Sequence, residues 1–276
     1  MIYIVGDIHA EWKAYWAAIQ AVANDSCPGP KHLICTGEFG YWPRGQFKDS
    51  LGEPVWPPKL PQDLGVRLWW LDGNQEALEA LEAIDALESD YCTSMDVPTL
   101  DGGSVELTYI PRAATLTIDG HKILFMGGSD SVPWDKASRI QKYQQKKAYG
   151  SQRLPTWFVQ EPVTEQQIEK ATSNVEKISG IEWVISHQPP NCFDMEGIKN
   201  LPTEQAPSRA RLNSLLWHID PKLWLFGDMH RRCNDEVDGI KWQGLNCSDL
   251  SPTYPNPYYV DVYIPEEDTF LTVKPC

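Results

Sequence analysis

Residues 2–9 read IYIVGDIH, four apolar residues typical of a β-strand followed by a glycine, Asp7 and His9. A strand of this kind places a carboxylate and an imidazole directly beyond its carboxyl end. Metal-ligand side chains follow strand-like runs at four further places: LICTGE at 33–38, LWWLDGN at 68–74, WVISH at 183–187 and LWLFGDMH at 223–230. The five segments therefore predict one centre at converging strand ends, with ligands typical of hydrolysis by two metal ions.

The order and spacing of these segments resemble the calcineurin-like metallophosphoesterase family. Its signature runs Gly-Asp-x-His, Gly-Asp, Gly-Asn-His-Glu, a single strand-end His and Gly-His-x-His, and the resemblance covers residues 6–230. It implies an α/β fold, a four-layer α/β/β/α sandwich of two mixed sheets flanked by helices. We expect residues 1–276 to form a single such domain, because a chain with 42% hydrophobic residues can bury one large core.

The same resemblance implies two divalent metal ions, bridged by one carboxylate and a water. One ion would be held by Asp7, His9, Glu38 and His230, and the other by Glu38, Asn74, His187 and Asp228. A metal-bridged hydroxide would attack phosphorus. The residues expected to act in catalysis are Asp7, Gln75, His187 and His230.

Three positions depart from the family signature. Glu38 replaces the bridging Asp, Gln75 replaces the His after the Asn, and Asp228 replaces the first His of Gly-His-x-His. Glu and Asp still offer hard oxygen ligands to a divalent ion. The extra methylene of Glu38 advances its carboxylate by about 1.5 Å, which could separate the metals beyond the roughly 3.5–4 Å that lets both contact one nucleophile.

The charge of the centre points to a class of substrate. Asp7, Glu38 and Asp228 are three anionic ligands, where the usual family pattern has two. With two divalent ions and one hydroxide, the net charge is then about zero rather than about plus one. Such a centre favours singly charged phosphodiesters over doubly charged phosphomonoesters. Its carboxylates also favour manganese, with magnesium, iron or zinc as alternatives.

Gln75 limits the leaving group. The resemblance implies that its family counterpart, a histidine, protonates the departing alkoxide or contacts the phosphate. An amide cannot be a general acid, and losing acid catalysis typically costs 10²–10⁴-fold in rate. We therefore expect substrates with acidic leaving groups, or phosphodiesters whose leaving group is assisted by a metal. The Gln75 amide can still donate a hydrogen bond to a phosphate oxygen.

These arguments predict a metal-dependent phosphodiesterase for nucleotides or cyclic nucleotides. One alternative is a catalytically impaired protein of this fold that binds a nucleotide or a protein partner, as the three departures would allow. A phosphomonoesterase or protein phosphatase is a further alternative, disfavoured by Gln75 and by the absence of Asp-Arg-Gly after the bridging motif. Residues expected to contact the substrate are Asn74, Gln75, Arg139, Trp157 and Arg231. A basic residue in a helix more often faces solvent, however, and a Trp more often packs.

Several segments around these motifs have readable patterns. EFGYWP at 38–43 resembles a phage and bacterial branch of the family, which has Gly-Asp-Phe-Gly-Tyr-Trp-Pro there. Residues 43–66, with five prolines, and residues 127–160 are expected to form loops beside the site. Helices are expected at 77–88 and, after a capping box at Thr164, as far as residue 179. Strands at 105–109, 114–118 and 122–126 are expected to begin the second sheet.

The amino-acid composition restricts the binding partners that we expect for this protein. A net charge of −14 argues against general binding to nucleic acids. The seven cysteines lack the spacing of a metal finger and the density of a disulfide scaffold, so we interpret them as packing residues in a reducing cytoplasm. No run of 18 apolar residues and no signal region is visible. We expect a soluble cytoplasmic protein, in the host cytoplasm if a phage encodes it, that binds a small phosphate ester such as a nucleotide.

Overall fold

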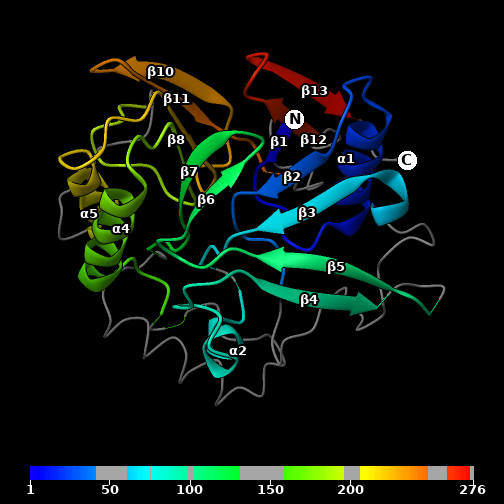
Figure 1. Ribbon diagram of the computed structural model, residues 1–276, viewed down its shortest axis with the longest axis horizontal. Coiled ribbons are helices and arrows are strands. Elements are labelled where there is room, and N and C mark those ends of the chain that lie inside the picture. Colours follow the sequence, from blue (N-terminus) through cyan, green and yellow to red (C-terminus); the bar gives the residue numbers. More distant parts are fainter. Residues whose placement is uncertain are drawn as a thin grey trace, which may run out of the picture.

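The computed structural model describes residues 1–41, 61–74, 76–98, 102–130, 158, 160–195, 206–247 and 260–273. The strands of the first sheet are β1 (Ile2–Val5), β2 (Lys31–Cys35), β3 (Val66–Trp70), β4 (Thr93–Pro98), β5 (Ser104–Tyr109), β12 (Val260–Ile264) and β13 (Thr269–Val273). Those of the second are β6 (Thr115–Ile118), β7 (His121–Met126), β8 (Trp183–Ser186), β9 (Leu223–Phe226), β10 (Cys233–Val237) and β11 (Ile240–Gly244). Their spatial orders are β13-β12-β1-β2-β3-β5-β4 and β10-β11-β9-β8-β7-β6 (Figure 1).

Each sheet has a parallel centre and antiparallel edges. In the first sheet β1, β2, β3 and β5 are parallel, and β4, β12 and β13 pair antiparallel with their neighbours. In the second, β7, β8, β9 and β11 are parallel, and β6 and β10 are antiparallel edges. Central parallel strands are covered on both faces, which explains why every residue of β1, β2 and β8 is buried.

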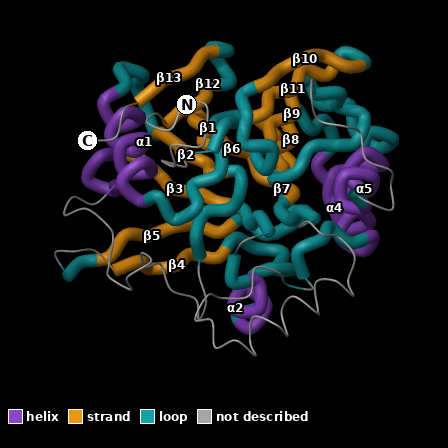
Figure 2. The backbone as a smooth tube through the Cα atoms, turned by 180° about the vertical axis from the view of Figure 1, so that it is seen from behind, coloured by secondary structure: helices purple, strands orange, loops and turns teal. Residues whose placement is uncertain are grey.

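Apolar residues on alternate strand positions hold the layers together. Tyr3 and Val5 pack toward helix α1 (Trp12–Asn24), whereas Ile2 and Ile4 join the cluster between the two sheets. The outer face of the second sheet packs against helices α4 (Glu165–Ile178) and α5 (Pro207–Leu215). Figures 1 and 2 show α1 and the α4–α5 pair on opposite sides of the two sheets. The predicted α/β/β/α sandwich is therefore confirmed. None of the described helices has the length and apolarity needed to span a membrane.

Helix α2 (Leu78–Ala83) is shorter than the helix predicted at 77–88. Leu78 and Leu81 are buried, as the pattern predicts, but Ile84 is 51% exposed. Asp85 adopts a left-handed conformation with φ of 53°, and the amide of Ala86 donates to the carbonyl of Leu81. These are the features of a Schellman ending, which stops the helix although the apolar spacing continues.

Two other expectations need correction. Strand β5, predicted to open the second sheet, pairs parallel with β3 in the first, so the second sheet begins at β6. The end of the predicted loop 43–66 is a 3₁₀ turn at Pro61–Leu64 followed by the start of β3. The remainder of that loop, and all of 127–160 except 127–130, 158 and 160, lie outside the described residues. The capping box is confirmed, with Thr164 and Gln167 exchanging hydrogen bonds.

A buried ion pair joins the two halves of the molecule. Arg112 donates to Asp72 Oδ2 from Nε at 2.9 Å and from Nη2 at 2.6 Å, and both side chains are fully buried. Tyr109 Oη donates to the other carboxylate oxygen of Asp72 at 2.7 Å. Arg112 also donates to the carbonyls of Glu161 and Pro162, just before α4. These contacts thus connect four segments: the ends of β3 and β5, the residues before β6 and the residues before α4.

Replacing Arg112 with methionine should lower the free energy of unfolding by about 3–5 kcal/mol, because the buried Asp72 carboxylate would lose its charged partner. Unfolding in urea measures the change. Arg67→Met is the matched control, since Arg67 is exposed on β3, and its effect should stay within about 0.5 kcal/mol. Similar losses in the two variants would show that the ion pair does not have this importance.

Candidate metal centre

The predicted ligands lie at the carboxyl ends of parallel strands from both sheets. In Figure 1 the arrowheads of β2, β3 and β5 point toward the side of the molecule that holds the second sheet. In the first sheet, Asp7 and His9 follow β1, Glu38 follows β2 and Asn74 follows β3. In the second sheet, His187 follows β8, and Asp228 and His230 follow β9. Packing the sheets face to face therefore brings ligands that are far apart in the sequence to one place.

Asp7, His9, Glu38 and His230 form a close cluster. One ligand atom from each lies within 4.8 Å of the others. His9 Nε2 is 3.0 Å from both His230 Nε2 and Glu38 Oε2. His230 Nε2 is also 3.1 Å from Asp7 Oδ2 and 3.2 Å from Glu38 Oε2. Two imidazole nitrogens and two carboxylates thus face one point, a donor set that suits a divalent transition metal.

His187 provides a second group of ligand atoms. Its Nδ1 lies 2.9 Å from the carbonyl oxygen of Thr36, so Nδ1 carries the proton and donates. This hydrogen bond leaves Nε2 as the ring atom for a metal, the arrangement common to metal-ligating histidines. Nε2 lies 3.5 Å from Asp228 Oδ1. A Cβ placed on Gly73 would be 2.7 Å from both His187 Nε2 and Glu38 Cγ, so Glu38 lies beside this second group too.

Polar neighbours orient the carboxylate of Asp228. Ser129 Oγ donates to Oδ1 at 2.9 Å, and Gln188 Nε2 donates to Oδ2 at 3.1 Å. Burial raises the pKa of Asp228, but the attraction to His187 and the hydrogen bonds from Ser129 and Gln188 outweigh it, and the pKa falls below its usual value. The backbone amide of Asp228 donates to Asp7 Oδ2 at 2.9 Å, which links the ends of β9 and β1.

The backbone around the ligands is unusual. His9, Glu38, Asp228 and His230 have φ values of 52°, 44°, 60° and 51°, in the left-handed region that residues other than glycine seldom adopt. Such conformations cost free energy and cluster at functional sites. Any larger residue at Gly227 would displace the carboxylate of Asp7, since a Cβ there would lie 2.2 Å from Asp7 Oδ1. The chain thus adopts costly turns that direct these side chains inward.

Three carboxylates make the centre attract positive charge. Burial lowers the pKa of His187, but the nearby charges of Asp7, Asp228 and Glu38 raise it to about 10. Burial likewise lowers the pKa of His230, and hydrogen bonds to Asp7 and Glu38 raise it to about 12. Asp7 Oδ1 is buried and accepts no hydrogen bond from the described residues. A buried, under-satisfied carboxylate beside imidazole nitrogens fits divalent metal ions, which would supply the charge that protons otherwise supply.

The structure gives less information about the other predicted site residues. Gln75, Arg139 and Trp157 lie outside the described residues. Arg231 is exposed, directly after His230. Asn74 is half-buried next to Gly73. The amide of Gly73 donates to Glu76 Oε2 at 2.7 Å, and burial together with the charge of Glu38 raises the pKa of Glu76 to about 8.

Sequence reasoning missed four residues around the centre. Thr36 acts through its main-chain carbonyl, which no side-chain pattern indicates. Ser129 and Gln188 were detectable in principle, because each is among the first polar residues after a buried strand. Cys247 lies with His9 and His230 in a second set whose ligand atoms are within 4.8 Å of one another. The sequence feature that could have identified Cys247 was its position just after β11.

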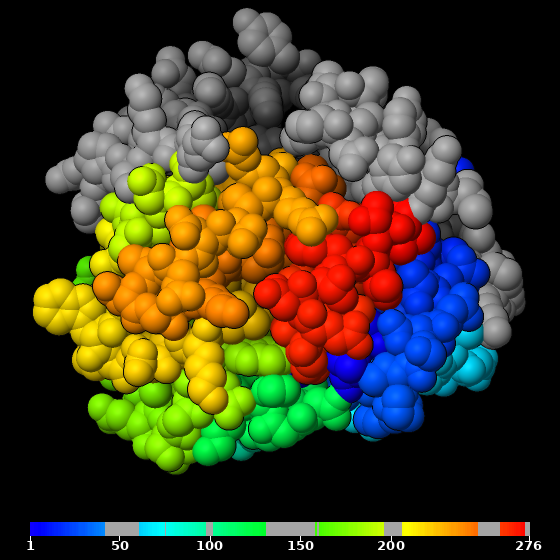
Figure 3. Space-filling model, turned by 90° about the horizontal axis from the view of Figure 1, so that it is seen from above, coloured from blue at the N-terminus to red at the C-terminus, as the bar shows by residue number. Residues whose placement is uncertain are grey.

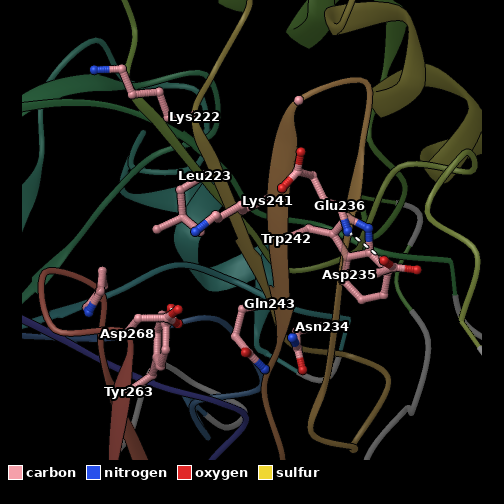
Figure 4. Close-up of a pocket in the computed structure, with 12 residues that line it drawn as sticks. Lys222, Leu223, Asn234, Asp235, Glu236, Lys241, Trp242, Gln243, Tyr263 and Asp268 are labelled. Carbon is pink, nitrogen blue, oxygen red and sulfur yellow. Dashed lines mark hydrogen bonds between the residues drawn. The ribbon is translucent and has the colours of Figure 1, made fainter.

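A groove of about 610 Å³ lies elsewhere, between the β10–β11 and β12–β13 hairpins. Figure 3 shows the two hairpins side by side on one face, in orange and red. Figure 4 shows side chains of both charges around the groove, among them Lys222, Glu236, Lys241 and Asp268. None of the seven predicted metal ligands lines it. Lys222 precedes β9, whereas the ligands follow that strand, so this groove is separate from the candidate centre.

Solved structures were compared with the chain. One aligns with a TM-score of 0.51 and 9% identity over 100% of this chain and 98% of the other. A Staphylococcus aureus protein provisionally named a 5'-nucleotidase gives 0.47 and 14%, over 99% of this chain but only 52% of its own. Phosphopantetheinyl hydrolase from Mycobacterium tuberculosis gives 0.41 and 11%, over 89% of each chain. Identities this low concern the fold alone, and the two scores below 0.5 support no conclusion.

Comparison of sequences, unlike these comparisons of structures, identifies the family. A search of curated protein sequences gave no significant match. The profile of the calcineurin-like phosphoesterase family, however, matches residues 1–232, well over half of the chain. This family typically uses a centre of two divalent metal ions, and the cluster of Asp7, His9, Glu38 and His230 offers suitable ligands. The protein therefore belongs to the calcineurin-like phosphoesterase family, a family of hydrolases that act on phosphoric ester bonds.

Proposed function

We propose that this protein is a metal-dependent phosphodiesterase for nucleotides or cyclic nucleotides, and that residues 1–276 act as one domain. The observation that carries the proposal is the meeting of three carboxylates, Asp7, Glu38 and Asp228, with His187 and His230. Two divalent ions in such a centre would be nearly neutralised by their ligands and a hydroxide. A nearly neutral centre favours a singly charged diester over a doubly charged monoester.

The ligands divide into two sets that share Glu38. Asp7, His9, Glu38 and His230 would hold one ion, and Glu38, Asn74, His187 and Asp228 would hold the other. Two such ions would lower the pKa of a bound water and offset negative charge on the phosphoryl group. The oxygen-rich ligands favour manganese, with magnesium, iron or zinc as alternatives.

The protein's own contribution is to hold these side chains in place. The Thr36 carbonyl fixes the ring of His187, and Ser129 and Gln188 fix the carboxylate of Asp228. Such outer partners matter, since removing one typically costs 10–100-fold in metal affinity or activity. For the substrate, we propose contacts from Asn74, Gln75, Arg139, Trp157 and Arg231. Gln75 would donate a hydrogen bond to a phosphate oxygen without supplying a proton to the leaving group.

We also propose that the protein belongs to the phage and bacterial branch of the family and that it is cytoplasmic. Support for the branch comes from EFGYWP at 38–43, of which residues 38–41 are described. Phe39 stacks on Trp70 with ring centroids 5.4 Å apart, and Tyr41 lies 5.7 Å from the same ring. These aromatic residues therefore pack the segment after Glu38 against the core beside β3, which would give the branch motif a structural reason.

Metal-stripped protein supplied with manganese should hydrolyse a nitrophenyl phosphodiester faster than the corresponding monoester, because the diester suits a nearly neutral centre and nitrophenolate leaves without an acid. Asp7→Asn should reduce diester turnover by about 100-fold or more, since it removes an anionic ligand. Release of nitrophenolate measures both rates. Asp220→Asn is the matched control, because Asp220 is exposed and lies outside the centre.

Other outcomes of this assay would contradict the proposed phosphodiesterase activity and favour another function. Faster monoester turnover would favour a phosphomonoesterase. Turnover no greater than that of Asp7→Asn would favour the catalytically impaired alternative, which Glu38, Gln75 and Asp228 allow. Calorimetry should then detect nucleotide binding, with the nucleotide recovered unchanged.

Gln75→His should restore a general acid and raise the hydrolysis of an alkyl phosphodiester by about 10²–10⁴-fold. The nitrophenyl diester should change little, since its leaving group needs no proton. Rates on both substrates, across a range of pH, measure the difference, and Gln62→His in the exposed part of the 3₁₀ turn is the control. Equal effects of Gln75→His on the two substrates would contradict the assigned role.

A further inference from the structure

The fold delivers Cys247 to the candidate metal centre. Strand β11 runs parallel to β9, and the amide of Leu245, just after β11, donates to the carbonyl of Phe226 at 2.9 Å. The chain then passes directly over Gly6, where an added Cβ would lie 2.1 Å from the carbonyl oxygen of Asn246. Only glycine permits this contact. Residues 245–247 are therefore held against the residue that precedes Asp7.

At this point Cys247 lies among metal ligands. Its Sγ and one ring nitrogen each of His9 and His230 are within 4.8 Å of one another. Cys247 is 5% exposed, so the thiol is buried at the centre. Two donors on one zinc ion are separated by at most roughly 4.4 Å, given bonds of about 2.3 Å to sulfur and 2.1 Å to nitrogen. The thiol thus needs a shift of only a few tenths of an ångström to share an ion with both rings.

We infer that Cys247 is a further ligand of the ion held by His9 and His230, and that it gives this position a preference for a softer metal such as zinc. The inference rests on the metal centre of the proposed function. Thiolate and imidazole favour zinc, whereas carboxylate and carbonyl oxygens suit manganese and magnesium. The second position keeps mainly oxygen donors, from Glu38, Asn74 and Asp228, beside the ring nitrogen of His187. The two positions therefore differ in selectivity.

Binding of the metal would be accompanied by loss of a proton. The thiol S–H bond breaks, its proton goes to solvent and a metal–sulfur bond forms, because the thiolate is the form that binds metals. No electron is transferred and no co-reactant is needed.

Cobalt provides the direct test, because a cobalt–thiolate bond gives a charge-transfer absorption in the near ultraviolet. Metal-stripped wild-type protein titrated with Co²⁺ should show this band together with the visible bands of bound cobalt. Cys247→Ser should bind cobalt without the near-ultraviolet band, and its dissociation constant for Zn²⁺ should rise on the order of 10–100-fold, with a much smaller change for Mn²⁺. Cys192→Ser is the matched control, since Cys192 is exposed and should leave all three readings unchanged.

Each other result overturns the inference. Bound cobalt without the thiolate band in wild type would exclude Cys247 as a ligand and leave the metal centre of the proposed function standing. Persistence of the band in Cys247→Ser would exclude Cys247 as its source. Failure of the wild type to bind cobalt at all would overturn both the inference and the proposed centre. Nuclear magnetic resonance of cadmium bound to wild type needs no variant: a resonance shifted by sulfur is expected, and one in the nitrogen–oxygen range would contradict it.

Discussion

The Arg112–Asp72 ion pair is the constraint on which the arrangement of the centre depends. Both groups are fully buried, so each charge would be costly without the other. Asp72 stands two residues before Asn74, and Arg112 lies three residues before β6, the first strand of the second sheet. Gly127 packs so closely that a Cβ would lie 2.2 Å from Asp72 Oδ1. The pair therefore fixes the distance between the ends of β3 and β7, and with it the spacing of the ligands that the two sheets contribute.

A second constraint is charge balance. Asp7, Glu38 and Asp228 bring three negative charges into a buried space, and the raised pKa values of His187 and His230 express the resulting demand for positive charge. Protons on the two rings and divalent ions are alternative ways to meet it, which couples metal binding to proton release. Replacing a histidine by Asp228 increases that demand, so the change of signature still favours a cation.

Much of the fold and of the centre could be predicted because strand ends leave a local signal. Apolar runs followed by Asp, Glu, Asn or His marked all five segments that carry candidate ligands, and the capping box of Thr164 marked the start of α4. The assignment of β5 failed because hairpin-like spacing does not state which sheet a strand joins. The end of α2 failed because a left-handed Asp85 stops the helix within a continuing apolar pattern. Cys247 was missed because its position depends on a backbone contact between Asn246 and Gly6. The spacing of the cysteines in the sequence does not reveal such a contact.

The altered side chains at Glu38 and Asp228 both still reach the candidate centre. Glu38 is one methylene longer than the family's Asp, yet its Oε2 still lies 3.0 Å from His9 Nε2. Its carbonyl accepts hydrogen bonds from the amides of Ile8 and His9, and its left-handed φ of 44° turns the chain at this point. Asp228 is shorter than the histidine it replaces, and Ser129 and Gln188 hold its carboxylate. The cluster of candidate ligands is thus preserved, while the carboxylate of Asp228 in place of a neutral imidazole makes its charge more negative by one.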